Sequence, residues 1–213
     1  MEILTYTLIS DGSSDTTLMQ IINWCLRNLY PELPINYQYA DFRSLQQKPR
    51  QGDVKRRIEL ASVLYPGDLY IYHRDAEKCN RNILDERKSE ILDVLDENTR
   101  NKVVCIIPIK MMESWLLTSE TAIKKAANNP NGRIQLNMPN IKKLEQISEP
   151  KDLLHQLLKD ATENSRRRQR NFNVEQAVHL VAEYTDCFDK LRQLPAFNKF
   201  EQELKRVVDL LLQ

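Results

Sequence analysis

Glycine is scarce in this chain, with four among 213 residues. So few glycines disfavour a barrel or a sandwich built from many tight turns. They also leave no GxGxxG or GxxxxGK(S/T) motif, the glycine-rich loops that cradle phosphates in nucleotide-binding proteins. We therefore do not expect a P-loop nucleotide hydrolase.

Long apolar runs are absent as well. The longest lie around residues 103–109 and 210–212, well below the ~20 residues that a membrane span needs. The first residues carry neither the basic segment nor the apolar stretch of a signal peptide. We therefore expect a cytoplasmic protein with no membrane association.

The chain also lacks an excess of either charge and any cysteine motif. Lys and Arg number 31 against 30 Asp and Glu, so nucleic-acid contacts driven by counterion release must be local. The four cysteines are far apart and without CxxC spacing, which favours reduced thiols over a zinc site or a disulfide framework. They are Cys25, Cys79, Cys105 and Cys187.

Strand-like and helix-like segments alternate in the first half of the chain. The strand-like segments are rich in β-branched and aromatic residues, and the helix-like segments have apolar residues at helical spacing. This alternation predicts an α/β fold with a mostly parallel sheet flanked by helices and right-handed crossovers. We expect strands over 4–10, 35–42, 68–73 and 102–109, and helices over 15–30, 53–64 and 86–97.

The second half of the chain is expected to be helical. Its breaks are Asn-, Pro- and Gly-rich segments, without a low-complexity linker. We therefore expect an α/β domain over residues 1–115 and a helical C-terminal region over 116–213 that packs on it. The predicted helices span 113–127, 151–162, 174–191 and 200–212.

Carboxylates follow three of the predicted strands. Asp11 and Asp15 come after the first strand, Asp75 and Glu77 after the third, and Glu113 after the fourth. In an open parallel sheet, ligands bind at the carboxyl ends of the strands. Clustered carboxylates repel one another unless a cation lies among them, and oxygen ligands suit Mg²⁺ or Mn²⁺. The pattern predicts metal-assisted phosphoryl transfer or hydrolysis.

The same residues carry a resemblance to a known family. Ser-Asp-Gly-Ser-Ser-Asp at 10–15 looks like the first TOPRIM motif, with Asp11 in the position that is commonly Glu. His-Arg-Asp-Ala-Glu at 73–77 stands where TOPRIM proteins carry Asp-x-Asp, with Glu77 as the second acid. Four later segments, in this order and spacing, make nearly the whole chain resemble the TOPRIM-like family DUF4276. They are 113–117, 126–132, 149–151 and 194–197.

This resemblance implies a function. The family is similar, in its TOPRIM part, to the nuclease half of the overcoming-lysogenization-defect enzymes, and its members are often encoded beside ATPases in neighbourhoods linked to defence against phage. It implies a metal-dependent nuclease acting on DNA or RNA, alone or with an ATPase partner; a homodimer is a further possibility. We expect the metal ligands to be Asp11, Asp15, Asp75 and Glu77.

Further candidate residues complete the predicted site. Glu113 is a candidate ligand or general base. Lys151, at a predicted helix start where the helix dipole disfavours a cation, is a candidate to neutralise the scissile phosphate. A solvated lysine beside neighbouring acids is the plainer interpretation. Arg74 and one dense basic cluster are candidates for contacts with nucleic acid, the cluster being alternatively a polar loop: Arg166, Arg167, Arg168 and Arg170.

Each acidic candidate also has a structural interpretation. Asp11 could cap the following helix, and Asp15 could favour its dipole. His73 is a candidate to orient a ligand or a water, although a lone histidine at a strand end is more often a hydrogen-bonded core residue. Two other functions are open: a catalytically silent regulatory or sensor subunit that docks an ATPase, and a small-molecule phosphotransfer enzyme that uses the same site.

Overall fold

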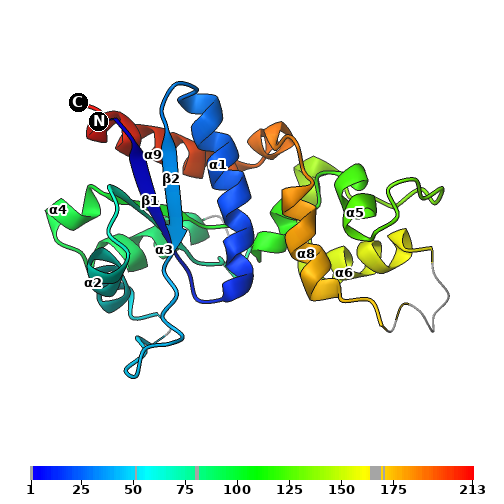
Figure 1. Cartoon of the computed structure of the whole chain (residues 1–213), viewed down its shortest axis with the longest axis horizontal. Helices are drawn as coiled ribbons and strands as arrows, with labels where there is room; N and C mark the ends of the chain where they lie inside the picture. The colour runs from blue at the N-terminus through cyan, green and yellow to red at the C-terminus, as the bar shows by residue number, and fades with distance from the viewer. Residues whose placement is uncertain (1, 51, 80–81, 164–168, 170) are drawn as a thin grey trace.

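The computed structural model describes residues 2–50, 52–79, 82–163, 169 and 171–213. A four-stranded sheet in the order β2-β1-β3-β4, parallel throughout, forms one half of the molecule (Figure 1). The expected α/β fold with a helical C-terminal region is confirmed. The strands are β1 (Leu4–Ile9), β2 (Ile35–Tyr39), β3 (Leu69–His73) and β4 (Val103–Ile106).

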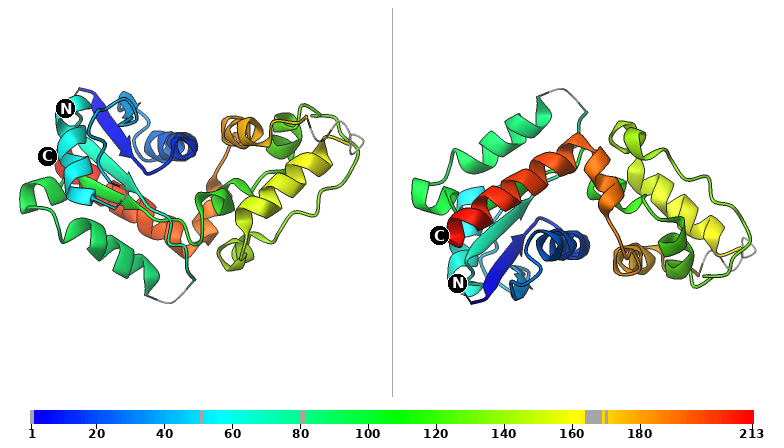
Figure 2. Two further views of the ribbon diagram at one scale, coloured as in Figure 1. Left: turned by 90° about the horizontal axis from the view of Figure 1, so that it is seen from below. Right: turned by 90° about the horizontal axis from the view of Figure 1, so that it is seen from above.

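Helices cover both faces of this sheet. The helices that connect successive strands are α1 (Leu18–Leu29), α2 (Val54–Leu64) and α3 (Ile83–Leu92). Figure 2 shows α1 and the last helix, α9 (Pro195–Leu211), on one face and α2 and α3 on the other. The apolar residues of α1 recur at helical spacing and are buried, which explains why this segment forms a helix against the sheet.

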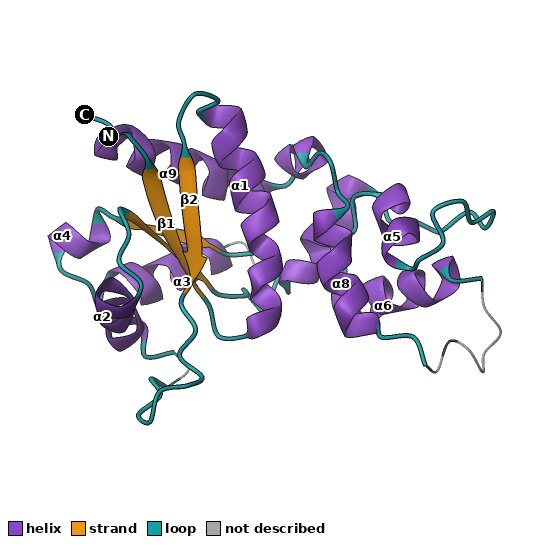
Figure 3. Cartoon of the chain, viewed as in Figure 1, coloured by secondary structure: helices purple, strands orange, loops and turns teal. Residues whose placement is uncertain are grey.

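Three helices of the second half of the chain form a separate bundle beside the sheet (Figure 3). Its helices α5, α6 and α8 pack on one another, whereas α9 returns to β4. Trp115 packs against α9, because the centre of its ring lies 5.3 Å from the centre of the Phe197 ring. The domain boundary that we expect at residue 115 stays a prediction. Although α9 follows this residue in the chain, it packs on the sheet. The bundle helices are α5 (Glu120–Ala126), α6 (Pro150–Ala161) and α8 (Val174–Glu183).

Several predicted helices are shortened or divided in the structure. The helix expected over 174–191 ends at Glu183, before the 3₁₀ turn that begins at Asp189, and the helix expected over 15–30 begins as a 3₁₀ turn up to Thr17. The helix expected over 86–97 ends at Leu92, and α4 (Glu97–Arg100) restarts where the Asp96 carboxylate accepts from the Thr99 N–H at 3.0 Å. The helix expected over 113–127 is a 3₁₀ turn, η2 (Met112–Leu116), followed by α5. Ser119 caps α5. In the last two cases a capping side chain stabilises a new helix start.

Short 3₁₀ turns make the other connections. They are η1 (Ser13–Thr17) after β1, η3 (Ile141–Gln146) before α6, and η4 (Asp189–Gln193) before α9. None of the helices in the described part of the chain combines the length and the apolar character that a membrane span requires.

The carboxyl edge of the sheet faces the helical bundle. The strands end at the same edge because Ile9 is aligned with Tyr72 in the parallel pairing of β1 and β3. The turn η1 lies at this edge and packs against α8. Thr17 Oγ1 lies 3.1 Å from His179 Nδ1 of α8. Side chains from the sheet and from the bundle can therefore meet at the carboxyl ends of the strands.

Candidate functional site

A cavity of about 380 Å³ lies at the carboxyl ends of β1 and β3. We call it the acidic pocket. The parallel sheet brings the four predicted metal ligands to its wall, as expected from acids that follow neighbouring strands. Glu113 is not part of this wall. The lining residues are Asp11, Asp15, Gly52, His73, Arg74, Asp75 and Glu77.

His73 holds two of these acids together. Its Nδ1 lies 3.1 Å from Asp15 Oδ2, and its Nε2 lies 3.2 Å from Asp75 Oδ1. The His73 side chain is 4% exposed. Burial by itself lowers the pKa of His73, but the hydrogen bonds and charges of the two carboxylates outweigh it and raise this pKa to about 10. The ring is therefore an imidazolium at neutral pH that donates to both acids.

Asp15 is fixed from two directions. Besides its contact with His73, its Oδ2 accepts from the N–H of Gly12 at 3.1 Å, which closes the turn η1. Burial alone raises the pKa of Asp15, but the hydrogen bond and charge of His73 lower it below its usual value. The structural role expected of Asp15 at a helix start and a place in the acidic pocket are thus compatible.

Asp11 is paired with a buried arginine. Arg57 Nη1 lies 3.2 Å from Asp11 Oδ1, and Nη2 donates to the carbonyl of Ser10. The first helical turn after β1 is capped at Gly12, so Asp11 does not fill the capping role that the sequence left open. The Asp11 side chain is 37% exposed, whereas that of Arg57 is 6% exposed. Asp11 is therefore a wall residue of the acidic pocket with one internal counterion.

Arg57 was not foreseen from the sequence, although a signal was present. It lies on the buried face of α2 with Val54, Ile58 and Ala61. A basic residue at an inward position of an amphipathic helix requires a partner inside the fold. The guanidinium also lies over the ring of Phe42, at 5.3 Å from its centre.

Asp75 and Glu77 differ in how firmly they are held. Asp75 contacts His73 through Oδ1. Its other oxygen, Oδ2, makes no hydrogen bond to a described residue. Glu77 is 72% exposed and contacts Arg87 at 3.3 Å. Its backbone has φ 61°, an uncommon value for glutamate, and its N–H donates to the Lys110 carbonyl.

Arg74 lines the acidic pocket, and its Nη1 binds Glu90 of α3 at 2.9 Å. Its predicted role in binding nucleic acid stays a prediction. The four arginines predicted to contact nucleic acid at 166–168 and 170 lie outside the described residues.

Glu113 and Lys151 come from outside the sheet. Glu113 lies in η2 and is buried. Burial raises the pKa of Glu113, and the charges of Asp75 and Asp15 raise it further, whereas Lys151 on α6 opposes this shift. The charges of Asp75 and Asp15 thus act on Glu113, although Glu113 does not line the acidic pocket. Lys151 Nζ lies 3.7 Å from a carboxylate of α8.

The donor set fits a hard cation in kind, since carboxylate oxygens predominate among the donors of the acidic pocket. Within the described residues, however, no three His, Cys, Asp or Glu side chains are grouped so that they could hold a metal ion. Instead, His73 and Arg57 supply the positive charge between the acids.

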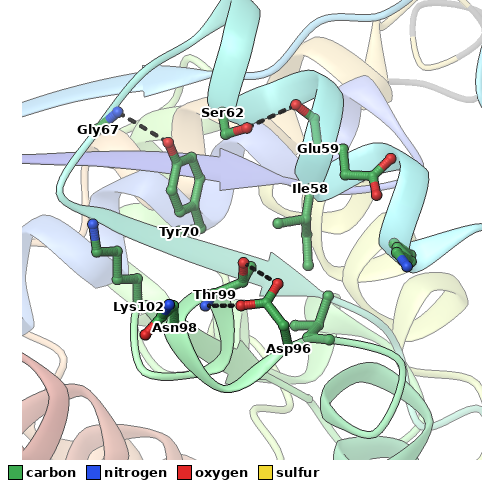
Figure 4. Close-up of a pocket in the computed structure, with 11 residues that line it drawn as sticks. Ile58, Glu59, Ser62, Gly67, Tyr70, Asp96, Asn98, Thr99 and Lys102 are labelled. Carbon is green, nitrogen blue, oxygen red and sulfur yellow. Dashed lines mark hydrogen bonds between the residues drawn. The ribbon is translucent and has the colours of Figure 1, made fainter.

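A different cavity, of about 240 Å³, lies between α2 and α4 (Figure 4). Two of its polar side chains bond within the fold: Ser62 donates to the Glu59 carbonyl, and Asp96 accepts from Thr99 at 2.7 Å. It contains none of the predicted site residues.

Comparison of the chain with family models, with curated proteins and with solved structures found no match in any of the three. The functional conclusion therefore rests on the residues of the acidic pocket and on their surroundings.

Proposed function

We propose that the acidic pocket binds a divalent cation and that the protein hydrolyses phosphodiester bonds of DNA or RNA. The observation that carries this proposal is the meeting of four carboxylates from the ends of β1 and β3 on one cavity. The resemblance to TOPRIM-like proteins supports the same activity, with Mg²⁺ or Mn²⁺ as cofactor and an ATPase as partner in phage defence.

The ligands of the cation would be Asp11, Asp15, Asp75 and Glu77. Asp75 has an oxygen, Oδ2, that is free of hydrogen bonds to described residues. When bound, such a cation lowers the pKa of a water and stabilises the leaving oxygen. The imidazolium of His73 keeps two of the carboxylates ionised and in place.

Glu113 and Lys151 would act beside this centre. Burial and the charges of Asp75 and Asp15 raise the pKa of Glu113, which favours proton uptake by this carboxylate and suits a general base. Lys151, whose charge reaches Glu113, would neutralise negative charge on the phosphate.

The test is cleavage of circular single-stranded DNA and of RNA by purified protein with Mg²⁺, with Mn²⁺ and with EDTA. Wild type is compared with Asp75→Ala and with a control, Asp93→Asn. Asp93 follows the last residue of α3, does not line the acidic pocket, and its side chain is 70% exposed. Asp75→Ala should lower the rate by about 10²-fold or more. Equal rates in the three proteins would remove the acidic pocket from the reaction.

A second function is favoured by a specific observation. The acids Asp11, Asp15 and Asp75 already have a basic partner within the fold, as a site without a cation requires. In this alternative, the protein is a catalytically silent subunit that docks an ATPase. It predicts no metal-dependent cleavage by wild type, together with co-purification of an ATPase partner.

A further inference from the structure

Basic side chains are concentrated between β2 and the first turn of α2. Residues 43–57 contain six Lys and Arg but a single acid, Asp53, although the net charge of the chain is only +1. Five of the six are exposed, and Arg57 is buried. This concentration is not apparent as a motif in the sequence, because the basic residues are spread over a loop and a helix start and do not form one continuous basic run. We call residues 43–50 the basic loop.

The basic loop borders one cavity and is followed in the chain by a residue that lines the acidic pocket. It projects beyond the carboxyl ends of β1 and β2, at the bottom of Figure 1. Arg43 and Lys48 line a cavity of about 150 Å³, the basic pocket, together with Arg57. Shortly after the loop, Gly52 lines the acidic pocket, and Asp11 lines both cavities. The two pockets are therefore neighbours at the same edge of the sheet.

The cations around the basic pocket are unequally paired. Arg43 makes three side-chain contacts of 2.6 to 3.1 Å with Asp41, and the guanidinium lowers the pKa of this carboxyl to about 2. Arg57 is paired as well. Lys48 and Arg50, in contrast, form no ion pair with any residue that the structure describes, although the charge of Lys48 also lowers the pKa of Asp41. Their charges are available to an anion from outside the chain.

We infer that the basic loop binds the phosphodiester backbone of a polynucleotide, with Lys48 and Arg50 as its contacts. The inference rests on the proposed function, because it names how that site holds its substrate. An acidic pocket repels a polyanion, and two free cations beside it offset this repulsion. A polynucleotide carries one charge per nucleotide and can place one phosphate on the basic loop while another reaches the acidic pocket. A free phosphate cannot do both.

The experiment measures binding of labelled single-stranded and duplex oligonucleotides by fluorescence anisotropy in EDTA at several salt concentrations. Wild type is compared with Lys48→Gln/Arg50→Gln and with a control, Lys125→Gln/Arg133→Gln. The control residues are exposed and form no ion pair with described residues either. The loop variant should bind roughly tenfold more weakly than the control, and its slope of log K against log salt should fall by about one unit per cation.

Several outcomes overturn the inference. They are absence of binding by wild type, equal affinity and salt slope in the two double variants, or displacement of the oligonucleotide by inorganic phosphate at an equal phosphate concentration. The last result assigns the site to free phosphate. Because EDTA removes divalent cations, the proposed nuclease function can fail in the cleavage assay while backbone binding stands, and the reverse holds too. Thermal unfolding of both variants checks that neither substitution disturbs the fold.

Discussion

The acidic and basic pockets lie at the same edge of the sheet, but they handle charge in opposite ways. In the acidic pocket, His73 and Arg57 provide counterions for three carboxylates inside the fold. On the basic loop, Lys48 lines the basic pocket and Arg50 follows it, and neither forms an ion pair with a described residue. Three acids of the acidic pocket are thus held in place by the protein itself, whereas Lys48 and Arg50 of the basic loop are available to a ligand.

The largest expected effect comes from removing the counterion of the acidic pocket. His73→Leu leaves Asp15 and Asp75 without their shared proton donor in a buried place, so the free energy of unfolding should fall by about 3–5 kcal/mol. Urea denaturation at pH 7 measures it. The control is His155→Leu, a histidine whose nearest carboxylate is 3.8 Å away. A loss no greater than that of the control contradicts the bridging role.

The same bridge predicts a pH dependence of stability. The pKa of His73 is about 10 in the folded protein against 6.5 in the unfolded chain. The folded state thus binds one more proton between these values, and the bridge's contribution is complete below pH 6.5 and lost as the pH rises through 10. Between pH 7 and 10, the free energy of unfolding of wild type should fall by about 1.4 kcal/mol per pH unit relative to His73→Gln. Urea denaturation across this range checks it. If the free energy of unfolding of the two proteins changes in parallel with pH, the proposed bridge is contradicted.

Much of this site was predictable from the sequence. Strand ends followed by acids, together with the rule that ligands bind at the carboxyl edge of a parallel sheet, predicted that Asp11, Asp15 and Asp75 come together. The alternation of segments predicted the parallel sheet itself. These features depend on local pattern and on chain order, which a single sequence contains.

Other features depend on contacts that local pattern does not contain. The double contact of His73 requires the register of β1 against β3 and the path of η1, which are set by packing across the whole sheet. Arg57 finds Asp11 only because α2 crosses behind β1. The return of α9 to β4 depends on the apolar cluster around Trp115, which joins residues that are distant in the chain.

A smaller effect is expected from Arg57, whose removal should change the affinities of the two pockets in opposite directions. Arg57→Met removes a positive charge that both pockets share, so Mn²⁺ should bind severalfold more tightly and an oligonucleotide in EDTA severalfold more weakly. The unpaired Ser10 carbonyl should also cost about 1–3 kcal/mol of stability. Titration calorimetry and anisotropy measure the two affinities.

Arg56→Met is the matched control for this prediction, because Arg56 is the neighbouring residue and is 58% exposed. Changes of the two affinities in the same direction, or changes equal to those of the control, are incompatible with a charge shared between the pockets.

The smallest effect is expected at the rim of the acidic pocket. Glu77 is exposed and its contact with Arg87 is a surface ion pair, so Glu77→Gln should change the free energy of unfolding by less than about 0.5 kcal/mol. Because Glu77 is a proposed metal ligand, the same substitution should still lower the Mg²⁺-dependent cleavage rate. Urea denaturation and the cleavage assay separate these roles. A large loss of stability together with an unchanged rate refutes this assignment.

The central claim is that the carboxylates of the acidic pocket bind a divalent cation, and its most direct test is Mn²⁺ binding measured by electron paramagnetic resonance. Wild type and the control Asp93→Asn should bind Mn²⁺ equally. Asp75→Asn should bind it about 10–100-fold more weakly. Absence of Mn²⁺ binding by wild type, or equal binding by Asp75→Asn, would contradict the claim.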